Sequence, residues 1–118
     1  MRIKELVTKC HETSVKHGWW EAANASLWTE PDEIRLVVEK LCLIHAEVSE
    51  ALEELRKNGL RISHTVKDRP AGFADELADV LIRVFDLCGY LNIDLEKALK
   101  EKMKYNETRP YRHGGKLA

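Results

Sequence analysis

The stretch that decides the fold is IRLVVEKLCLIHAEVSEALEEL, residues 34–55. Its apolar residues recur every three or four positions, the spacing that gathers side chains on one face of an α-helix. Thr29 or Glu30 can cap the start of this helix, and Gly59 can end it. The pattern therefore predicts one long helix over residues 31–58.

Further helices are expected on both sides of the long one. The same apolar period runs along residues 2–17, 72–90 and 95–107. Residues 59–71 are polar and predict a loop, with a short hairpin as the alternative. These patterns predict an all-α fold, with a single domain over residues 1–118, a bundle of about four helices, and a basic mobile tail over about 109–118.

Composition argues against several classes of protein. The chain has 118 residues, 44% of them hydrophobic and 33% charged, which suits one folded domain with a modest core. Its net charge of −1 gives no basic field that would attract nucleic acid. The sequence has no apolar run of about 18 residues, the length needed to span a membrane. The N-terminus lacks the apolar core of a signal peptide. We therefore expect a cytoplasmic protein with neither nucleic acid nor membrane as a partner.

The long helix also bears on assembly. A helix of roughly 27 residues spans about 40 Å, more than one domain of this size can cover. We expect its remaining apolar surface to be buried by another copy, in a homodimer or a dimer of dimers (a homotetramer). The three cysteines are odd in number and lack a C-x-x-C spacing, so disulfides and zinc sites are not expected.

Two pairs of carboxylates are spaced one helical turn apart on the two longest helices, as Glu47-x-x-Glu50 and Glu76-x-x-Asp79. Residues at i and i+3 share a helix face, so packing these helices together would bring four carboxylates to one place. Their mutual repulsion calls for a cation, and Mg²⁺ suits oxygen ligands and substrate phosphates. The pattern predicts a magnesium-dependent hydrolase of phosphate-rich small molecules. The alternative is a solvated acidic face, because such pairs are common in charged helices.

Two other groups of residues could serve such a substrate. Lys102, Asn106 and Arg109 follow i, i+4, i+7 spacing, so one helix face could offer them to phosphates. Trp19, Trp20 and Trp28 could form a stacking wall for a base, or they could pack in the core or at an interface. A basic tail that balances an acidic protein is the alternative for the first group.

Together these residues resemble the all-α NTP pyrophosphatase superfamily, the MazG-like proteins and their dCTP pyrophosphatase relatives. The resemblance runs from about residue 34 to 109. It rests on four stretches in order: HAEVSEALEE (45–54), ADELADVLIRV (74–84), IDLEKAL (93–99) and KMKYNETRP (102–110). Many MazG proteins carry a second glutamate where this chain has Ala46, so the chain looks more like the shorter dCTP pyrophosphatase form.

The resemblance implies a magnesium-dependent cleavage of nucleoside triphosphates to the monophosphate and pyrophosphate, and we expect deoxynucleotides to be the preferred substrates. It implies four metal ligands, Glu47, Glu50, Glu76 and Asp79, with Mn²⁺ as a substitute for Mg²⁺. Lys102, Asn106 and Arg109 match the family's phosphate-binding positions, and Glu47 and Glu50 are the candidates for the catalytic base. Two alternatives stay open: a phosphoribosyl-ATP pyrophosphatase, and a non-catalytic helical dimer that binds nucleotides or a partner protein.

Overall fold

The computed structural model describes residues 1–24, 28–60 and 64–118. The elements are α1 (Ile3–Lys16), the 3₁₀ turn η1 (Glu21–Asn24), α2 (Glu30–Asn58), β1 (His64–Val66), β2 (Arg69–Ala71), α3 (Phe73–Leu91), α4 (Leu95–Glu107) and α5 (Arg112–Gly115). The prediction of an all-α fold is confirmed, and all four predicted helices are present. None of the described helices combines the length and apolar character needed to cross a bilayer.

The start of α2 is fixed by its own sequence. Thr29 accepts a hydrogen bond from the Asp32 backbone N–H, and the Asp32 carboxylate accepts one from the Thr29 backbone N–H, which forms a capping box. Pro31 occupies the first turn, where its missing N–H costs nothing. At the other end Gly59 adopts a φ of 65° and closes the helix, as predicted.

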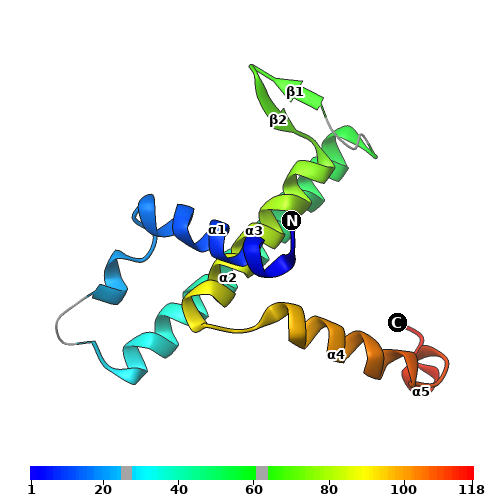
Figure 1. Cartoon of the computed structure of the whole chain (residues 1–118). Coiled ribbons are helices and arrows are strands. Elements are labelled where there is room, and N and C mark those ends of the chain that lie inside the picture. The colour runs from blue at the N-terminus through cyan, green and yellow to red at the C-terminus, as the bar shows by residue number, and fades with distance from the viewer. Residues whose placement is uncertain (25–27, 61–63) are drawn as a thin grey trace.

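α3 is the centre of the packing, because α1 and α2 both lie against it (Figure 1). The buried cluster consists of Trp20, Leu36 and Leu87, and the Trp20 ring stacks on Tyr90 with centroids 4.2 Å apart. α1 approaches α3 closely at Gly89, where an added Cβ would lie 2.5 Å from the His11 Cβ. This core is small: among the described residues no large side chain is less than 2% exposed.

A short antiparallel hairpin joins α2 to α3, where a loop was the first expectation and a hairpin the alternative. β1 pairs with β2 in a register that sets Val66 opposite Arg69. Lys67 and Asp68 form the turn, with φ values of 50° and 63°, as two-residue hairpin turns require. Residues 61–63 of the predicted loop, and 25–27 of the segment before α2, lie outside the described residues.

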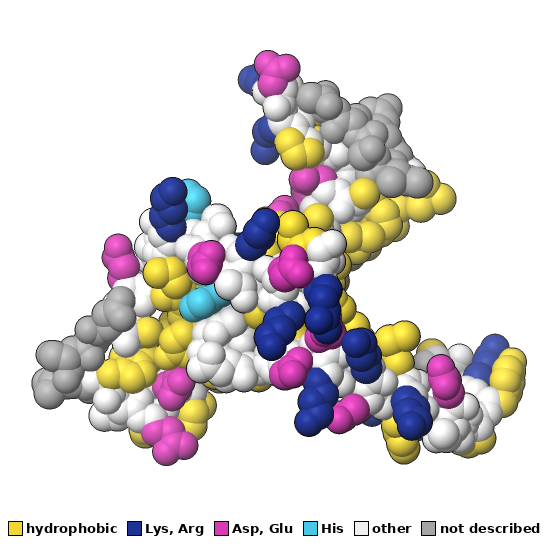
Figure 2. Space-filling view, in the orientation of Figure 1, with side chains coloured by type: hydrophobic (Ala, Val, Ile, Leu, Met, Phe, Trp, Pro, Cys, Tyr) yellow, Lys and Arg dark blue, Asp and Glu magenta, His cyan; other side chains and the backbone are white. Residues whose placement is uncertain are grey.

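α4 does not join the other three helices in a four-helix bundle. Asn92 takes a left-handed conformation after α3, Asp94 caps α4, and the helix extends away from the α2–α3 pair (Figure 1). It touches the rest of the chain mainly near its start, where Arg2 pairs with Glu96. Figure 2 shows Lys and Arg side chains gathered along this projecting helix. We call α4 the arm.

Candidate metal and ligand site

Three of the four predicted carboxylates lie together. Glu47 and Glu50 stand one turn apart on α2, and Glu76 belongs to the first turn of α3. Each offers an oxygen within 4.8 Å of the others. Asp79 lies one turn further along α3 and is not a member of this group. We call Glu47, Glu50 and Glu76 the acidic cluster.

Two oxygens of the acidic cluster are buried without a hydrogen-bond donor. Glu47 is only 9% exposed, and its Oε1 accepts a 2.6 Å hydrogen bond from Arg83 Nε on α3. Glu47 Oε2 and Glu76 Oε2 have no partner among the residues that the structure describes. A buried carboxylate oxygen without a partner is unfavourable, so the pair calls for a bound donor or cation.

The carboxyl pKa values in this region are raised, and the causes differ. The pKa of Glu50 is raised chiefly by the neighbouring Glu47 carboxylate, which favours a proton shared between the two groups and repels a second negative charge. Burial is the leading cause for Glu76 and Asp79, and nearby carboxylates add to it. Loss of solvent and like-charge repulsion both disfavour the ionised form. Burial and neighbouring charge therefore act in the same direction on all three carboxyl groups.

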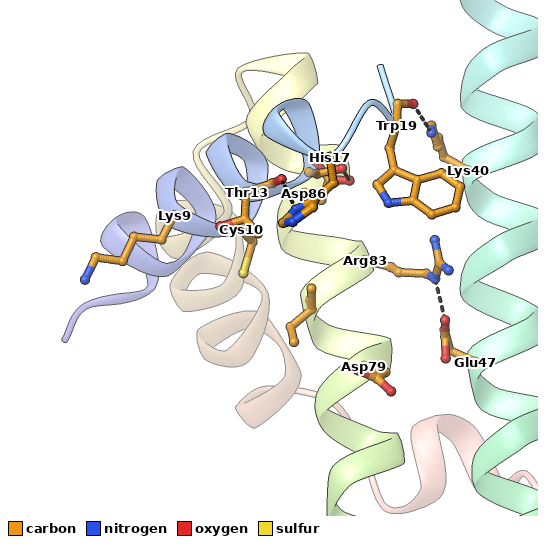
Figure 3. Close-up of a pocket in the computed structure, with 12 residues that line it drawn as sticks. Lys9, Cys10, Thr13, His17, Trp19, Lys40, Glu47, Asp79, Arg83 and Asp86 are labelled. Atoms are coloured by element: carbon orange, nitrogen blue, oxygen red, sulfur yellow. Dashed lines mark hydrogen bonds and ion pairs between the residues drawn. The ribbon is translucent and has the colours of Figure 1, made fainter. Parts of the chain in front are cut away.

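A pocket of about 370 Å³ opens beside the acidic cluster. Glu47 and Asp79 line one end, and α1 forms a wall with Cys10, Thr13 and His17 (Figure 3). Arg83 lies beside Glu47, Asp86 lies near His17 on the α1 side, and Trp19 and Lys40 lie beyond Arg83 at the other end (Figure 3). Carboxylates, cations and an aromatic ring therefore border one cavity large enough for a small organic molecule.

The three tryptophans have different roles. Trp20 is 4% exposed in the core, and Trp28 packs against the same buried cluster. Both therefore pack in the core, which was the alternative to a stacking wall for a base. Trp19 is 58% exposed and borders the pocket, with Arg83 Cζ 6.0 Å and Lys40 Nζ 5.9 Å from its ring centre. Of the three, Trp19 remains available as a stacking surface.

The predicted phosphate-binding residues are not brought to the acidic cluster within one chain. Lys102 and Asn106 are exposed on the arm, and Arg109 follows its end half-buried. Lys102 and Arg109 lie over the ring of Tyr105, at 5.0 Å and 5.8 Å. The arm projects away from α2 and α3 (Figure 1), and none of the three residues lines the pocket.

Nine of the twelve residues that line the pocket were not identified as site residues from the sequence, and Lys40, Arg83 and Asp86 are the charged ones among them that contact other elements. Asp86 Oδ1 accepts hydrogen bonds from Trp20 Nε1 at 2.8 Å and is 2.9 Å from His11 Nδ1, while its Oδ2 accepts from Ser14 Oγ at 2.7 Å. The available signal was the polar stripe along α3, in which Arg83 and Asp86 follow Asp79 at helical steps. Their partners on other elements could not be read from that stripe.

Comparison with known proteins adds no further assignment. A scan against protein-family models, a search of curated proteins and a search of solved structures each found no match for this chain. The site defines a class only by its chemistry, as a carboxylate cluster beside a pocket with cationic and aromatic walls.

Proposed function

We propose that this chain is a magnesium-dependent nucleoside triphosphate pyrophosphohydrolase, which converts a (d)NTP and water to the (d)NMP and pyrophosphate. The observation that carries the proposal is a pair of buried oxygens, of Glu47 and Glu76, that no donor of the described residues reaches, in a cluster that adjoins a ligand-sized pocket. The resemblance of the carboxylate motifs to the all-α NTP pyrophosphatases supports the same reaction.

The acidic cluster fits a hard divalent cation. All its donors are carboxylate oxygens, which Mg²⁺ and Mn²⁺ accept and which zinc sites rarely use alone. Glu47, Glu50 and Glu76 would hold the ion, with Asp79 one turn away on the same side of α3. When bound, the cation would neutralise phosphate charge and lower the pKa of water.

Other roles in the proposed reaction fall to side chains around the acidic cluster and the pocket. Arg83 holds one oxygen of Glu47 and leaves the other directed to the cluster. Such a bond fixes the orientation of a ligand carboxylate. Glu50 is exposed and pairs with no arginine among the described residues, so of the two candidate bases it is the better placed to take a proton from an attacking water. Trp19 would stack on the base.

We further propose that the working form is a dimer or a dimer of dimers. The surface area is 9262 Å², whereas a compact chain of this mass exposes about 6,600 Å². The radius of gyration is 17.2 Å, against about 13.5 Å for a compact chain of this length. Apolar residues along α2 and α3 are 45% to 56% exposed: Ile34, Val38, Leu41, Val48, Leu52, Leu77 and Leu81.

A second copy would also supply what one chain lacks at the site. The arm carries Lys102, Asn106 and Arg109 away from its own carboxylates, while its apolar Leu99 and Met103 are 42% and 56% exposed. A basic, partly apolar helix is complementary to an acidic, partly apolar α2–α3 pair. In this proposal the arm of one copy brings its cations to the acidic cluster of the other.

The testing experiment measures pyrophosphate release from the common NTPs and dNTPs, with and without Mg²⁺. We expect magnesium-dependent release that is lost in Glu50→Ala and Glu76→Gln but kept in Glu53→Ala, an exposed glutamate on the same helix as Glu50. Circular dichroism checks that each variant stays helical. Normal turnover in the first two variants, or no release from any triphosphate, would contradict the proposal; in the second case phosphoribosyl-ATP is the next substrate to assay.

A further inference from the structure

Lys40 is a buried cation without a carboxylate partner. It is 8% exposed, and its Nζ donates a 2.7 Å hydrogen bond to the Trp19 backbone oxygen (Figure 3). The same nitrogen lies 4.5 Å from the ring centre of Trp20. No ion pair joins Lys40 to any of the described residues. A buried ammonium is costly unless its donors are used, so the two remaining N–H groups call for acceptors.

This end of the pocket offers donors and few acceptors. Arg83 adds a guanidinium, which can only donate. The carboxylates near Arg83 are already engaged: Asp86 through both oxygens with His11, Ser14 and Trp20, and Glu47 through Oε1 with Arg83 itself. A ligand group seated between Lys40 and Trp19 would therefore meet N–H groups and an aromatic face.

The position of Lys40 along α2 matches the reach of a nucleotide. Lys40 precedes Glu47 by seven residues, and this separation corresponds to a rise of about 10 Å. Both residues border the same pocket. With its phosphates at the acidic cluster, a nucleotide would place its sugar beside Arg83 and its base near Lys40 and Trp19.

We propose that Lys40 is a specificity-determining residue that selects bases with a keto oxygen over bases with an amino group at the same position. Guanine, hypoxanthine, uracil and thymine belong to the favoured class, and adenine and cytosine to the disfavoured one. The inference rests on the proposed function for the orientation of the ligand. Lys40 has only donors, so a keto oxygen satisfies it, whereas an amino group faces it donor to donor.

The expected discrimination follows from the hydrogen bond alone. A hydrogen bond that involves a charged group changes affinity by roughly ten- to a hundredfold. A base with an amino group at the same position would leave the buried Lys40 donor unsatisfied. Hypoxanthine and adenine make the cleanest comparison, because they differ at the 6-position and at the protonation of the neighbouring ring nitrogen.

The first test measures the binding of dIMP and dAMP by titration calorimetry. Wild-type protein should bind dIMP about ten to a hundred times more tightly. Lys40→Met, which keeps the length of the side chain without its donors, should bring the two affinities close together. Lys9→Met is the matched control, since Lys9 borders the same pocket but is exposed, and it should keep the preference.

Several results would overturn the inference. Equal binding of the two nucleotides by the wild type would do so, as would no binding of either, or a preference that survives in Lys40→Met. Should Lys40→Met not fold, Lys40→Gln offers a donor and an acceptor, and it should likewise reduce the preference. A turnover assay with dITP and dATP separates the two proposals: a binding preference without cleavage contradicts the hydrolase alone, whereas cleavage without a keto preference contradicts the role of Lys40 alone.

Discussion

Replacing Asp86 by alanine should lower the free energy of unfolding by about 3 kcal/mol. The Asp86 carboxylate ties three parts of the chain together: α3, which carries it, α1 through His11 and Ser14, and the segment after α1 through Trp20. Without it the donors on α1 and Trp20 lose their shared acceptor. The packing of α1 on α3 therefore depends on one carboxylate.

The magnitude can be worked from the exposure of the partners. Hydrogen bonds to a charged group contribute about 1.5–3 kcal/mol each, so three would give an upper limit near 9 kcal/mol. Asp86 and Ser14 border the pocket, where water can replace the lost contacts to His11 and Ser14. Trp20 is 4% exposed, and its buried indole N–H would retain a penalty of about 1–3 kcal/mol. A net loss of about 3 kcal/mol follows.

Urea unfolding followed by tryptophan fluorescence and circular dichroism measures this loss. Asp86→Asn keeps an acceptor of the same shape and should lose only about 1 kcal/mol. Glu12→Ala removes an exposed carboxylate from α1 and should change stability by less than about 0.5 kcal/mol. If Asp86→Ala unfolds within about 1 kcal/mol of the wild type, the carboxylate does not hold α1 in place, and the reasoning is refuted.

Three further predictions concern the acidic cluster and the crossing of α1 with α3. Millimolar Mg²⁺ should raise the melting temperature, because a tenfold excess of the ion over its Kd stabilises the folded state by about 1.4 kcal/mol. Glu76→Gln should remove most of that rise, and an equal rise in the variant would contradict the metal site. In the presence of a chelator, stability should fall as pH rises from about 4.5 towards neutral, because the raised pKa values of Glu50, Glu76 and Asp79 let the folded state bind more protons than the unfolded state in that window. The urea midpoint against pH measures this effect, and a curve of the same slope in Glu76→Gln would exclude that residue as a contributor. Gly89→Ala should destabilise the protein by about 1–2 kcal/mol in thermal unfolding. The added Cβ would lie 2.5 Å from the His11 Cβ, and this clash outweighs the gain of about 1 kcal/mol that alanine brings to a helix. A stabilised variant would show that α1 can shift away from α3 at little cost.

The helices were predictable because their signals are local. The apolar period of α2, its cap at Thr29 and its stop at Gly59 depend on residues within a turn or two of each other. The hairpin was a weaker prediction, because its turn uses Lys67 and Asp68 where two-residue turns favour Asn-Gly or Asp-Gly. The arm's apolar period predicted a helix, but periodicity does not say which surface covers the apolar side.

The candidate site was predictable where it depends on local spacing and not where it depends on how the helices pack. The i, i+3 spacing predicted that Glu47, Glu50, Glu76 and Asp79 would be neighbours, once their two helices were expected to pack. The first three lie together in the structure, and Asp79 is not a member of their group. The bond between Glu47 and Arg83 depends on the register between α2 and α3, which no local pattern encodes. Lys40 was not identified for the same reason, because its hydrogen-bond partner is the backbone oxygen of Trp19, at a sequence separation of 21.

The glycine at position 89 also governs what the pocket can hold. α1 comes close to α3 because Gly89 has no side chain, and the α1 wall of the pocket is built from the same helix. A small side chain at this one position would push that wall outwards while leaving every residue that lines the pocket unchanged. The size of the pocket can thus be altered from behind its wall, so two sequences could differ in the molecules that fit while sharing the same lining residues.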